Sequence, residues 1–262
     1  MPLDLHWRLR LSRSASRAGC PRGDPSGTDR GLKRASCRDR APRRELSRSV
    51  GGHGERHRGG GVVGGRFKAW ARGCIVGTAV GDALGAPVEF LSAETIIERF
   101  GPAGITTLEP WDGHRAESFT DDTQMTVATA RGVARSLENG VDTTSAIWEE
   151  YLAWLRTQDD PVQQRGPGTT CLMALRGGEP GQLDDPVNNS KGCGGIMRVA
   201  PVGLGFGPGW AFELGTASAA LTHGHPSGYL AAGFLADVIS RLVRGTPSLY
   251  RSIEDAREEL LG

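Results

Sequence analysis

The chain has 262 residues, of which 38% are hydrophobic, enough for one large or two small globular domains with a buried core. Its longest apolar stretch, residues 73–81, is too short to span a bilayer, and no secretory signal is found near the start, so we expect neither a membrane-embedded nor a secreted protein. The net charge of +1 hides an asymmetry, because residues 1–66 hold 16 Lys and Arg against 6 Asp and Glu, whereas residues 67–262 hold 15 against 24.

Residues 1–65 are rich in Arg, Gly and Ser and hold few side chains that could fill a core, which predicts a disordered basic arm. Three interpretations fit such an arm: a weak transit peptide, a nucleic-acid-binding arm, or a translated segment upstream of the true start codon. We favour the third. Nucleic acid is not expected as a partner, because the arm has no interleaved aromatic residues beyond Trp7 and no recognisable nucleic-acid-binding fold.

The cysteines form an odd set without a Cys-x-x-Cys pair, which is typical of reduced thiols in a cytosol. They are Cys20, Cys37, Cys74, Cys171 and Cys193. The sequence therefore predicts a cytoplasmic protein with no membrane partner.

From residue 66 onward apolar residues recur at helical spacing, and no run alternates for long enough to predict a strand. The sequence therefore predicts an all-α domain over residues 66–262. Helices are expected at approximately 66–85, 121–138, 143–157, 169–176, 210–222, 227–244 and 248–261.

The first expected helix carries Gly73, Gly77, Gly81 and Gly85 at a spacing of four, which places them on one face. A face without side chains lets another backbone approach, so close packing inside a helical bundle is expected. Asp82 follows the third glycine, and an Asp among small residues is unfavourable unless it is paired. We expect Asp82 to be an internal hydrogen-bonding anchor, with membership of a functional site as the alternative.

The run Phe119-Thr120-Asp121-Asp122-Thr123 sets two carboxylates between hydroxyl residues at the start of a predicted helix. Thr120 or Asp121 can cap the free N–H groups of the first turn. Carboxylate and hydroxyl oxygens also suit hard cations such as Mg²⁺, Ca²⁺ or Mn²⁺. An acidic helix start without any metal explains the same residues, because Asp is favoured there by the helix dipole.

Two glycine-rich loops and one histidine pair are weaker signals. Residues 165–170 and 190–195 could each let a ligand approach backbone amides, as phosphate-binding loops do, but neither has a nucleotide-fold spacing. His223 and His225 lack the partners of a zinc site, so they are either ligand contacts or plain loop residues.

Four segments in this order resemble the ADP-ribosylglycohydrolase family. They are 77–90 with the sequence Gly-Thr-Ala-Val-Gly-Asp-Ala-Leu-Gly-Ala-Pro-Val-Glu-Phe, the Thr-Asp-Asp-Thr run at 120–123, 192–201 with Gly-Cys-Gly-Gly-Ile-Met-Arg-Val-Ala-Pro, and 222–226 with Thr-His-Gly-His-Pro. The resemblance covers roughly residues 68–245. It implies an all-α orthogonal helical bundle with two Mg²⁺ ions, or Mn²⁺ in some members, at the bottom of a cleft.

The resemblance also implies roles for individual residues. The metal ligands would be Thr120, Asp121 and Asp122. The catalytic residues would be Glu89, Asp121 and Asp122, with Glu89 on a mobile loop over the substrate. The substrate-binding residues would be Ser190, Gly192 and Gly194 at the diphosphate and His223 at the ADP-ribose. Cys193 stands where several members have Asn.

This sequence departs from the family at one point, because no Asp-x-Asp-Thr run follows Asp122. That run supplies the family's remaining metal ligands, so the expectation is a truncated product, a fragment or a non-catalytic relative. We expect a Mg-dependent hydrolase that removes ADP-ribose from modified protein side chains or small molecules. The alternative is an inactive truncated relative that binds ADP-ribose weakly.

Truncation would also leave apolar helix faces uncovered, and such faces favour self-association. The side chains expected to be exposed in this way are Leu214, Leu221, Leu230, Phe234 and Val238.

Overall fold

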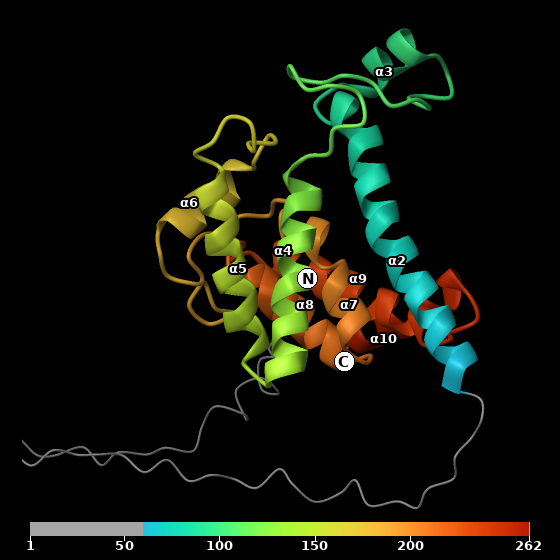
Figure 1. Cartoon of the computed structure of the whole chain (residues 1–262), viewed down its shortest axis with the longest axis vertical. Helices are drawn as coiled ribbons and strands as arrows, with labels where there is room; N and C mark the ends of the chain where they lie inside the picture. The colour runs from blue at the N-terminus through green and yellow to red at the C-terminus, as the bar shows by residue number, and fades with distance from the viewer. Residues whose placement is uncertain (1–59, 262) are drawn as a thin grey trace, which may run out of the picture. The chain divides into compact units, whose positions relative to one another are not determined.

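The computed structural model describes residues 60–261, with side chains from residue 65 onward (Figure 1). Helices account for the regular structure of this part of the chain, and only an isolated bridge between Trp111 and His114 has β-type pairing. The predicted all-α class is confirmed. The predicted basic arm, residues 1–65, falls almost wholly outside the described residues.

The helices follow the expected order, with two additions. They are α2 (Gly60–Gly85), α3 (Ala93–Phe100), α4 (Asp121–Asn139), α5 (Thr143–Thr157), α6 (Thr169–Arg176), α7 (Ala200–Gly205), α8 (Trp210–Ala220), α9 (Pro226–Val243) and α10 (Leu249–Leu261), with 3-10 turns η1 (Ala86–Val88) and η2 (Ile196–Arg198). The sequence analysis missed α3 and α7. Helix α7 has six residues, among them a proline and two glycines, so it does not repeat an apolar pattern. Helix α3 is as long as α6 and amphipathic, and the sequence analysis did not recognise its pattern.

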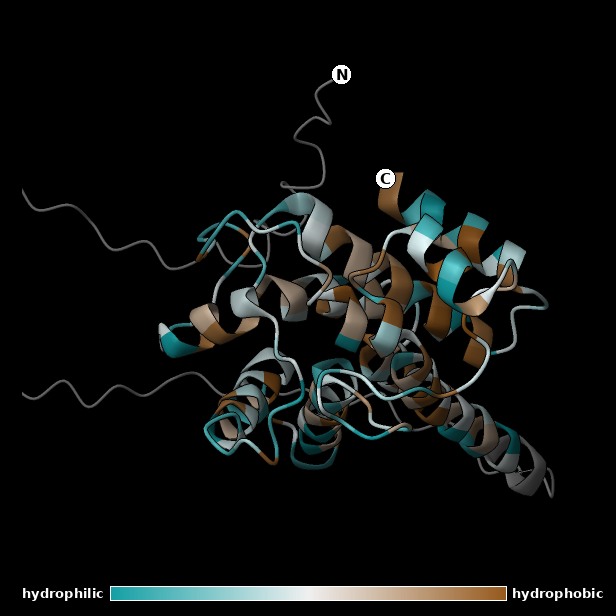
Figure 2. Ribbon diagram, turned by 90° about the horizontal axis from the view of Figure 1, so that it is seen from above, coloured by the Kyte–Doolittle hydropathy of each residue, from teal (hydrophilic) through white to brown (hydrophobic). Residues whose placement is uncertain are grey.

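The core lies where α4, α5 and α7 to α10 pack together. Its largest buried side chains include Met125 on α4 and Ile147 and Tyr151 on α5. Helix α10, which ends at the C-terminus marked in Figure 2, is amphipathic and carries both hydrophilic and hydrophobic residues.

Close packing through glycine occurs between α8 and α9 and not along α2. A Cβ atom added to Gly233 would lie 2.1 Å from the Thr216 hydroxyl, so these helices could not approach as they do with a side chain there. A Cβ added to Gly73, Gly77 or Gly81 of α2 would meet no atom within 4 Å. The expectation of a packed glycine stripe on α2 is therefore wrong for the described residues.

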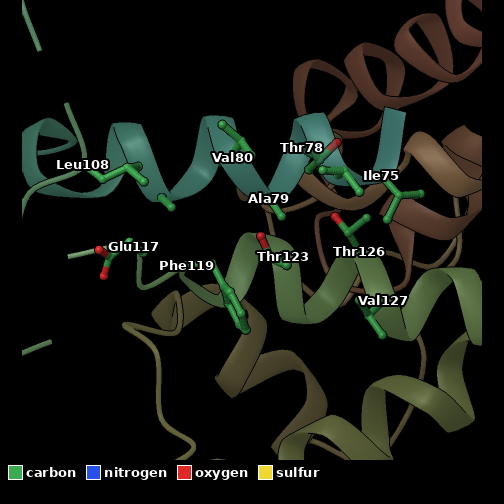
Figure 3. A pocket seen from close by; sticks show the side chains of 12 residues that line it. Ile75, Thr78, Ala79, Val80, Leu108, Glu117, Phe119, Thr123, Thr126 and Val127 are labelled. Carbon is green, nitrogen blue, oxygen red and sulfur yellow. The ribbon is translucent and has the colours of Figure 1, made fainter. Parts of the chain in front are cut away.

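Helix geometry explains where the α2 glycines lie. Side chains of residues i and i+2 point about 200° apart around a helix axis. Ile75 and Ala79 each follow a glycine of the stripe by two positions, so they lie on the face opposite the glycines. It is this second face that lies toward α4, and Figure 3 shows Ala79 pointing to Thr123 across the groove between the two helices.

The apolar surface also differs from the prediction. Leu221 is 5% and Val238 4% exposed, and the other three side chains expected to be uncovered on α8 and α9 are half-buried, because α5, α7 and α10 pack against this pair. The exposed apolar residues include Val76 and Val80 on α2, at 52% and 55%, and Phe90 after η1, at 90%. Other exposed apolar side chains lie at the start of α8 and on α10, for example Trp210 and Tyr250, so the uncovered apolar residues are spread over several helices.

Within residues 60–261 no single helix is long and apolar enough to cross a membrane. One bent pair, Gly65–Val88 with Ala93–Phe100, meets the test by length and composition alone.

Candidate functional site

The site begins at the N-terminus of α4. Thr120 is the N-cap residue, and its hydroxyl accepts a hydrogen bond of 3.2 Å from the Asp122 amide. The Asp82 carboxylate accepts hydrogen bonds from the Thr120 and Thr123 amides and from the Thr123 hydroxyl. Asp82 thus joins the end of α2 to the start of α4, as expected of an anchor, and two of the α4 amides that a helix start leaves free are satisfied.

Asp121 and Asp122 are close to other carboxylates and have no cationic partner. Burial raises the pKa of Asp121 to about 7, and the charges of Asp122 and Glu89 add to this, while a hydrogen bond from the Gly168 amide lowers it. Burial, with Asp82 and Glu89, raises the pKa of Asp122 to about 6. Burial and Asp82 raise the pKa of Glu89 as well. None of the ion pairs formed between described residues involves any of these carboxylates.

The oxygen atoms of Thr120, Asp121 and Asp122 are of the chemical type that binds hard cations. An uncompensated pair of carboxylates beside a hydroxyl is the donor set that Mg²⁺ or Mn²⁺ takes. The number of donors is small, because Asp82 and one oxygen of Asp121 are already hydrogen-bonded to amides. Across residues 60–261 no group of three or more His, Cys, Asp or Glu side chains is placed to hold a metal ion. The three predicted metal ligands therefore stay a prediction, with water or substrate needed to complete the six positions around Mg²⁺.

The start of α6 connects this acidic cluster to the second glycine loop. The Gly168 amide donates to Asp121 at 3.1 Å, and the Thr170 hydroxyl lies 3.4 Å from the Ser190 hydroxyl. The sequence allowed the amides of the 165–170 loop to contact a ligand. In the structure the Gly168 amide holds Asp121, and Gly168 is the N-cap residue of α6.

The 190–195 loop folds tightly against His223. A Cβ on Gly192 would lie 3.3 Å from Nε2 of His223 and equally far from the Ser190 hydroxyl, and one on Gly194 would lie 2.5 Å from the His223 ring. The Ser190 hydroxyl accepts a hydrogen bond of 3.2 Å from the Gly192 amide. These glycines are therefore required by close approach, and the loop and His223 form one surface. The loop also lies near the acidic cluster, since the charge of Asp122, after burial, raises the pKa of Cys193.

Asn188 holds this arrangement in place and was missed by sequence reasoning. Its Oδ1 accepts from the amides of Ser190 and Gly224, at 3.0 and 3.2 Å, and its Nδ2 donates to the Thr222 carbonyl at 2.8 Å. The signal in the sequence was an Asn pair in a turn-rich loop, which does not say which backbone segments the side chain joins.

The two histidines have different roles. His223 is 2% exposed, and its Nδ1 lies 2.8 Å from the Thr222 hydroxyl. Burial and the charge of Arg198 lower the pKa of His223 to about 4. His225 is the N-cap residue of α9, and its Nδ1 accepts from the Ser227 amide at 3.0 Å. The His223 ring packs against the glycine loop, whereas His225 contacts the loop through its amide, which donates to the Ser190 carbonyl at 3.3 Å.

A pocket of about 820 Å³ opens beside the acidic cluster. Glu89 and Thr120 line it together with Trp111 and Gly166, so two of the predicted site residues face the same space. The Trp111 ring lies against His114, with centroids 4.3 Å apart, and its Nε1 donates to the Ser118 carbonyl. A second hollow of about 370 Å³ lies between α2 and α4 (Figure 3). It is lined mainly by apolar side chains and does not include the carboxylates, so we do not assign chemistry to it.

The structure thus brings together residues that lie far apart in the sequence, from Glu89 to His223. The start of α6 connects Asp121 to the 190–194 loop, and the charge of Asp122, after burial, raises the pKa of Cys193 in that loop. His223 packs against the same loop. Glu89 is close enough to both aspartates for its charge to raise their pKa values. Sequence reasoning missed Asn188, Arg198 and Thr222, which hold these residues in position.

A family model described as ADP-ribosylglycohydrolase matches residues 66–262. The chain therefore belongs to the ADP-ribosylglycohydrolase family, as its motifs indicated. The ADP-ribosyl-[dinitrogen reductase] glycohydrolase of Rhodospirillum rubrum is 31% identical over 193 residues, which cover 72% of this chain and 61% of the relative. The ADP-ribosylhydrolase ARH3 of Mus musculus is 30% identical over 73% of this chain and 52% of its own length.

The fold agrees with this membership. A solved chain from an ADP-ribosylglycohydrolase-related protein complex superimposes with a TM-score of 0.55 and 26% identity, over 74% of this chain and 62% of that chain. The chain thus spans about half to three fifths of the length of these relatives.

Proposed function

We propose that this protein is a hydrolase that releases ADP-ribose from modified protein side chains or small molecules, with Mg²⁺ as its cofactor. The observation that carries the proposal is the proximity of Asp121 and Asp122 to the glycine loop at 190–194. The start of α6 connects Asp121 to the loop, and, after burial, the charges of both aspartates raise the pKa of Cys193 within it. An anionic diphosphate suits the backbone amides of a glycine-rich loop, and a sugar carbon that becomes positively charged suits nearby carboxylates. Membership of the ADP-ribosylglycohydrolase family supports the same substrate.

Each group has a defined task in this proposal. The 190–194 loop, which packs too tightly for side chains, binds the diphosphate through its amides, and His223 donates to the ligand from the far side. Asp121 and Asp122 hold the ribose and favour the positive charge that develops at the anomeric carbon. Glu89, whose pKa is raised, transfers a proton between the attacking water and the leaving group. Bound Mg²⁺ would supply Lewis-acid stabilisation and orient the ribose hydroxyls and a water molecule.

The test is the release of ADP-ribose from arginine-linked, serine-linked and small-molecule conjugates, measured by chromatography with and without Mg²⁺. We expect Mg²⁺-dependent release by the wild-type chain and a loss of at least about a hundredfold for Asp122→Asn. Asp159→Asn is the matched control, because Asp159 is exposed, carries the same charge and lies outside the site. Equal release by the two variants, or none by the wild type on any conjugate, would refute the hydrolase.

One observation favours a second function, the binding of ADP-ribose without turnover. The described chain offers two carboxylates and one hydroxyl at the start of α4, which is half of an octahedral shell at most. Calorimetry with ADP-ribose separates the two functions when it is combined with the release assay. Binding without release of ADP-ribose supports the second function, and turnover by the 262-residue chain excludes it.

A further inference from the structure

Arg198 is a buried cation beside the glycine loop. It is 1% exposed, and its guanidinium lies 4.3 Å from the centre of the Tyr151 ring. No carboxylate in the described part of the chain forms an ion pair with it, and its Nε atom has no hydrogen-bond partner there. A buried cation without a carboxylate is costly to a fold, so a role beyond packing is indicated.

A short chain of hydrogen bonds leads from Arg198 to the site. Its Nη2 donates to the Thr222 hydroxyl at 2.6 Å, and the same hydroxyl oxygen lies 2.8 Å from Nδ1 of His223. An arginine can only donate, so the Thr222 oxygen is the acceptor in the first bond. The hydroxyl proton then needs an acceptor, and among the described residues Nδ1 of His223 is the one within reach. Nδ1 therefore carries no proton, and the ring proton sits on Nε2.

The Nε2 edge of His223 faces the ligand-binding loop. A methyl group on Gly192 would lie 3.3 Å from Nε2, and one on Gly194 would lie 2.8 Å from it. Nε2 has no hydrogen-bond partner within residues 65–261. A donor fixed at this place can bind an oxygen atom of a molecule that the loop holds.

We propose that Arg198 and Thr222 are positioning residues that fix His223 as the neutral tautomer protonated at Nε2, so that it donates a hydrogen bond to a ligand at residues 190–194. The tautomer follows from the hydrogen bonds alone, whereas the identity of the ligand as ADP-ribose rests on the proposed function. The lowered pKa of His223 agrees with a ring that stays neutral near pH 7.

Nitrogen-15 NMR of the full chain labelled at histidine tests the tautomer directly, because the two ring nitrogens have well-separated shifts when one of them is protonated. We expect Nε2 of His223 to be the protonated atom in the ligand-free wild type. Thr222→Val, which keeps the shape and removes the hydroxyl, should mix the two tautomers, and Thr222→Ser should retain the wild-type one. Arg198→Met, which has a side chain of similar length without hydrogen-bond donors, should likewise give a mixture of the two His223 tautomers.

Calorimetry with ADP-ribose provides the second measurement. Thr222→Val should weaken binding about tenfold, the loss of about one well-placed hydrogen bond, and Thr222→Ser should restore it. Thr216→Val is the matched control, since Thr216 is also buried but its hydroxyl has no partner among the described residues. It should change neither the tautomer nor the affinity.

The outcomes are separable from those of the proposed function. A wild-type His223 protonated at Nδ1 overturns the inference, whatever the protein binds and whether or not the variants fold. A tautomer and an affinity that both survive Thr222→Val overturn it too. A wild type with the Nε2 proton that binds no ADP-ribose upholds the positioning of His223 and refutes the proposed function.

Discussion

The aspartates around α4 show how position decides the role of one side chain. The Asp82 carboxylate accepts hydrogen bonds from amides at the start of α4. Asp121 and Asp122 keep oxygen atoms free of such bonds and have raised pKa values. The sequence pattern predicted a cap at Thr120 or Asp121, and the structure has it at Thr120. It also favoured an anchor at Asp82, with a site residue as the alternative, and the Asp82 carboxylate does accept from the α4 amides. It could not predict Arg198, Thr222 or Asn188 as site residues, because their roles depend on contacts between segments that lie far apart in the chain.

Removal of the Asp82 carboxylate tests its role as an anchor. Asp82→Ala leaves the Thr120 and Thr123 amides without their acceptor, so we expect a loss of about 2–3 kcal/mol in the free energy of unfolding. Asp142→Ala is the control, because Asp142 caps α5 through a single amide and its loss should cost about 1 kcal/mol. Urea unfolding measures both, and equal losses would show that Asp82 does not join α2 to α4.

The raised pKa of Asp121 predicts how stability depends on pH. The pKa of the Asp121 carboxyl is higher in the folded state than in the unfolded state, where it is near 3.8. Its contribution to the free energy of unfolding is therefore fully present below about pH 3.8 and is lost as the pH rises through about 7. Asp121→Asn should therefore have little effect near pH 4 and should stabilise the chain by on the order of 2 kcal/mol near pH 8, measured with a chelator present. An effect independent of pH would contradict the uncompensated charge at Asp121.

Seven helices were predicted close to their observed bounds. Apolar periodicity and capping residues depend on neighbouring residues alone, so the sequence is sufficient to recognise them. The helices α5 and α6 begin and end at the predicted residues. The local sequence could not predict which element packs against each face of a helix. The glycines of α2 suggested a packed face, yet close glycine packing is found between α8 and α9.

Alanine substitutions test the free face of α2. Gly77→Ala adds a methyl group that meets nothing within 4 Å, so we expect the helix to gain about 0.5–1 kcal/mol of stability. Gly132→Ala is the contrast, because its methyl would lie 2.6 Å from the Ile147 backbone and should destabilise the chain. Thermal melts report both signs. A destabilising Gly77→Ala would mean that another surface covers this face in solution.

In the molecule as a whole, the candidate site offers too few oxygen ligands to fill the coordination shell of Mg²⁺. Beside them lies the 190–194 loop, which suits a ligand rich in oxygen atoms. Mg²⁺ alone should bind weakly, since Thr120, Asp121 and Asp122 offer only part of its six positions. ADP-ribose can supply further oxygens, so the two should bind cooperatively. We expect millimolar Mg²⁺ alone to leave the melting temperature nearly unchanged and Mg²⁺ with ADP-ribose to raise it by more than the sum of the separate effects.

A large shift with Mg²⁺ alone would contradict this expectation. It would mean that the chain's own donors complete the metal shell. Ca²⁺ at the same concentration is a useful comparison, because its larger and more flexible shell tolerates a different set of oxygens.

The central claim is that the start of α4, the 190–194 loop and His223 form one site for ADP-ribose. Its most direct test is calorimetric titration of the full chain with ADP-ribose, for the wild type, Gly192→Ala and Gly207→Ala. A methyl group at Gly192 enters the 3.3 Å space beside His223 and Ser190, whereas one at Gly207 meets nothing within 4 Å. We predict binding by the wild type and Gly207→Ala and a loss of about tenfold or more for Gly192→Ala. No binding by the wild type, or equal binding by all three proteins, would contradict the account.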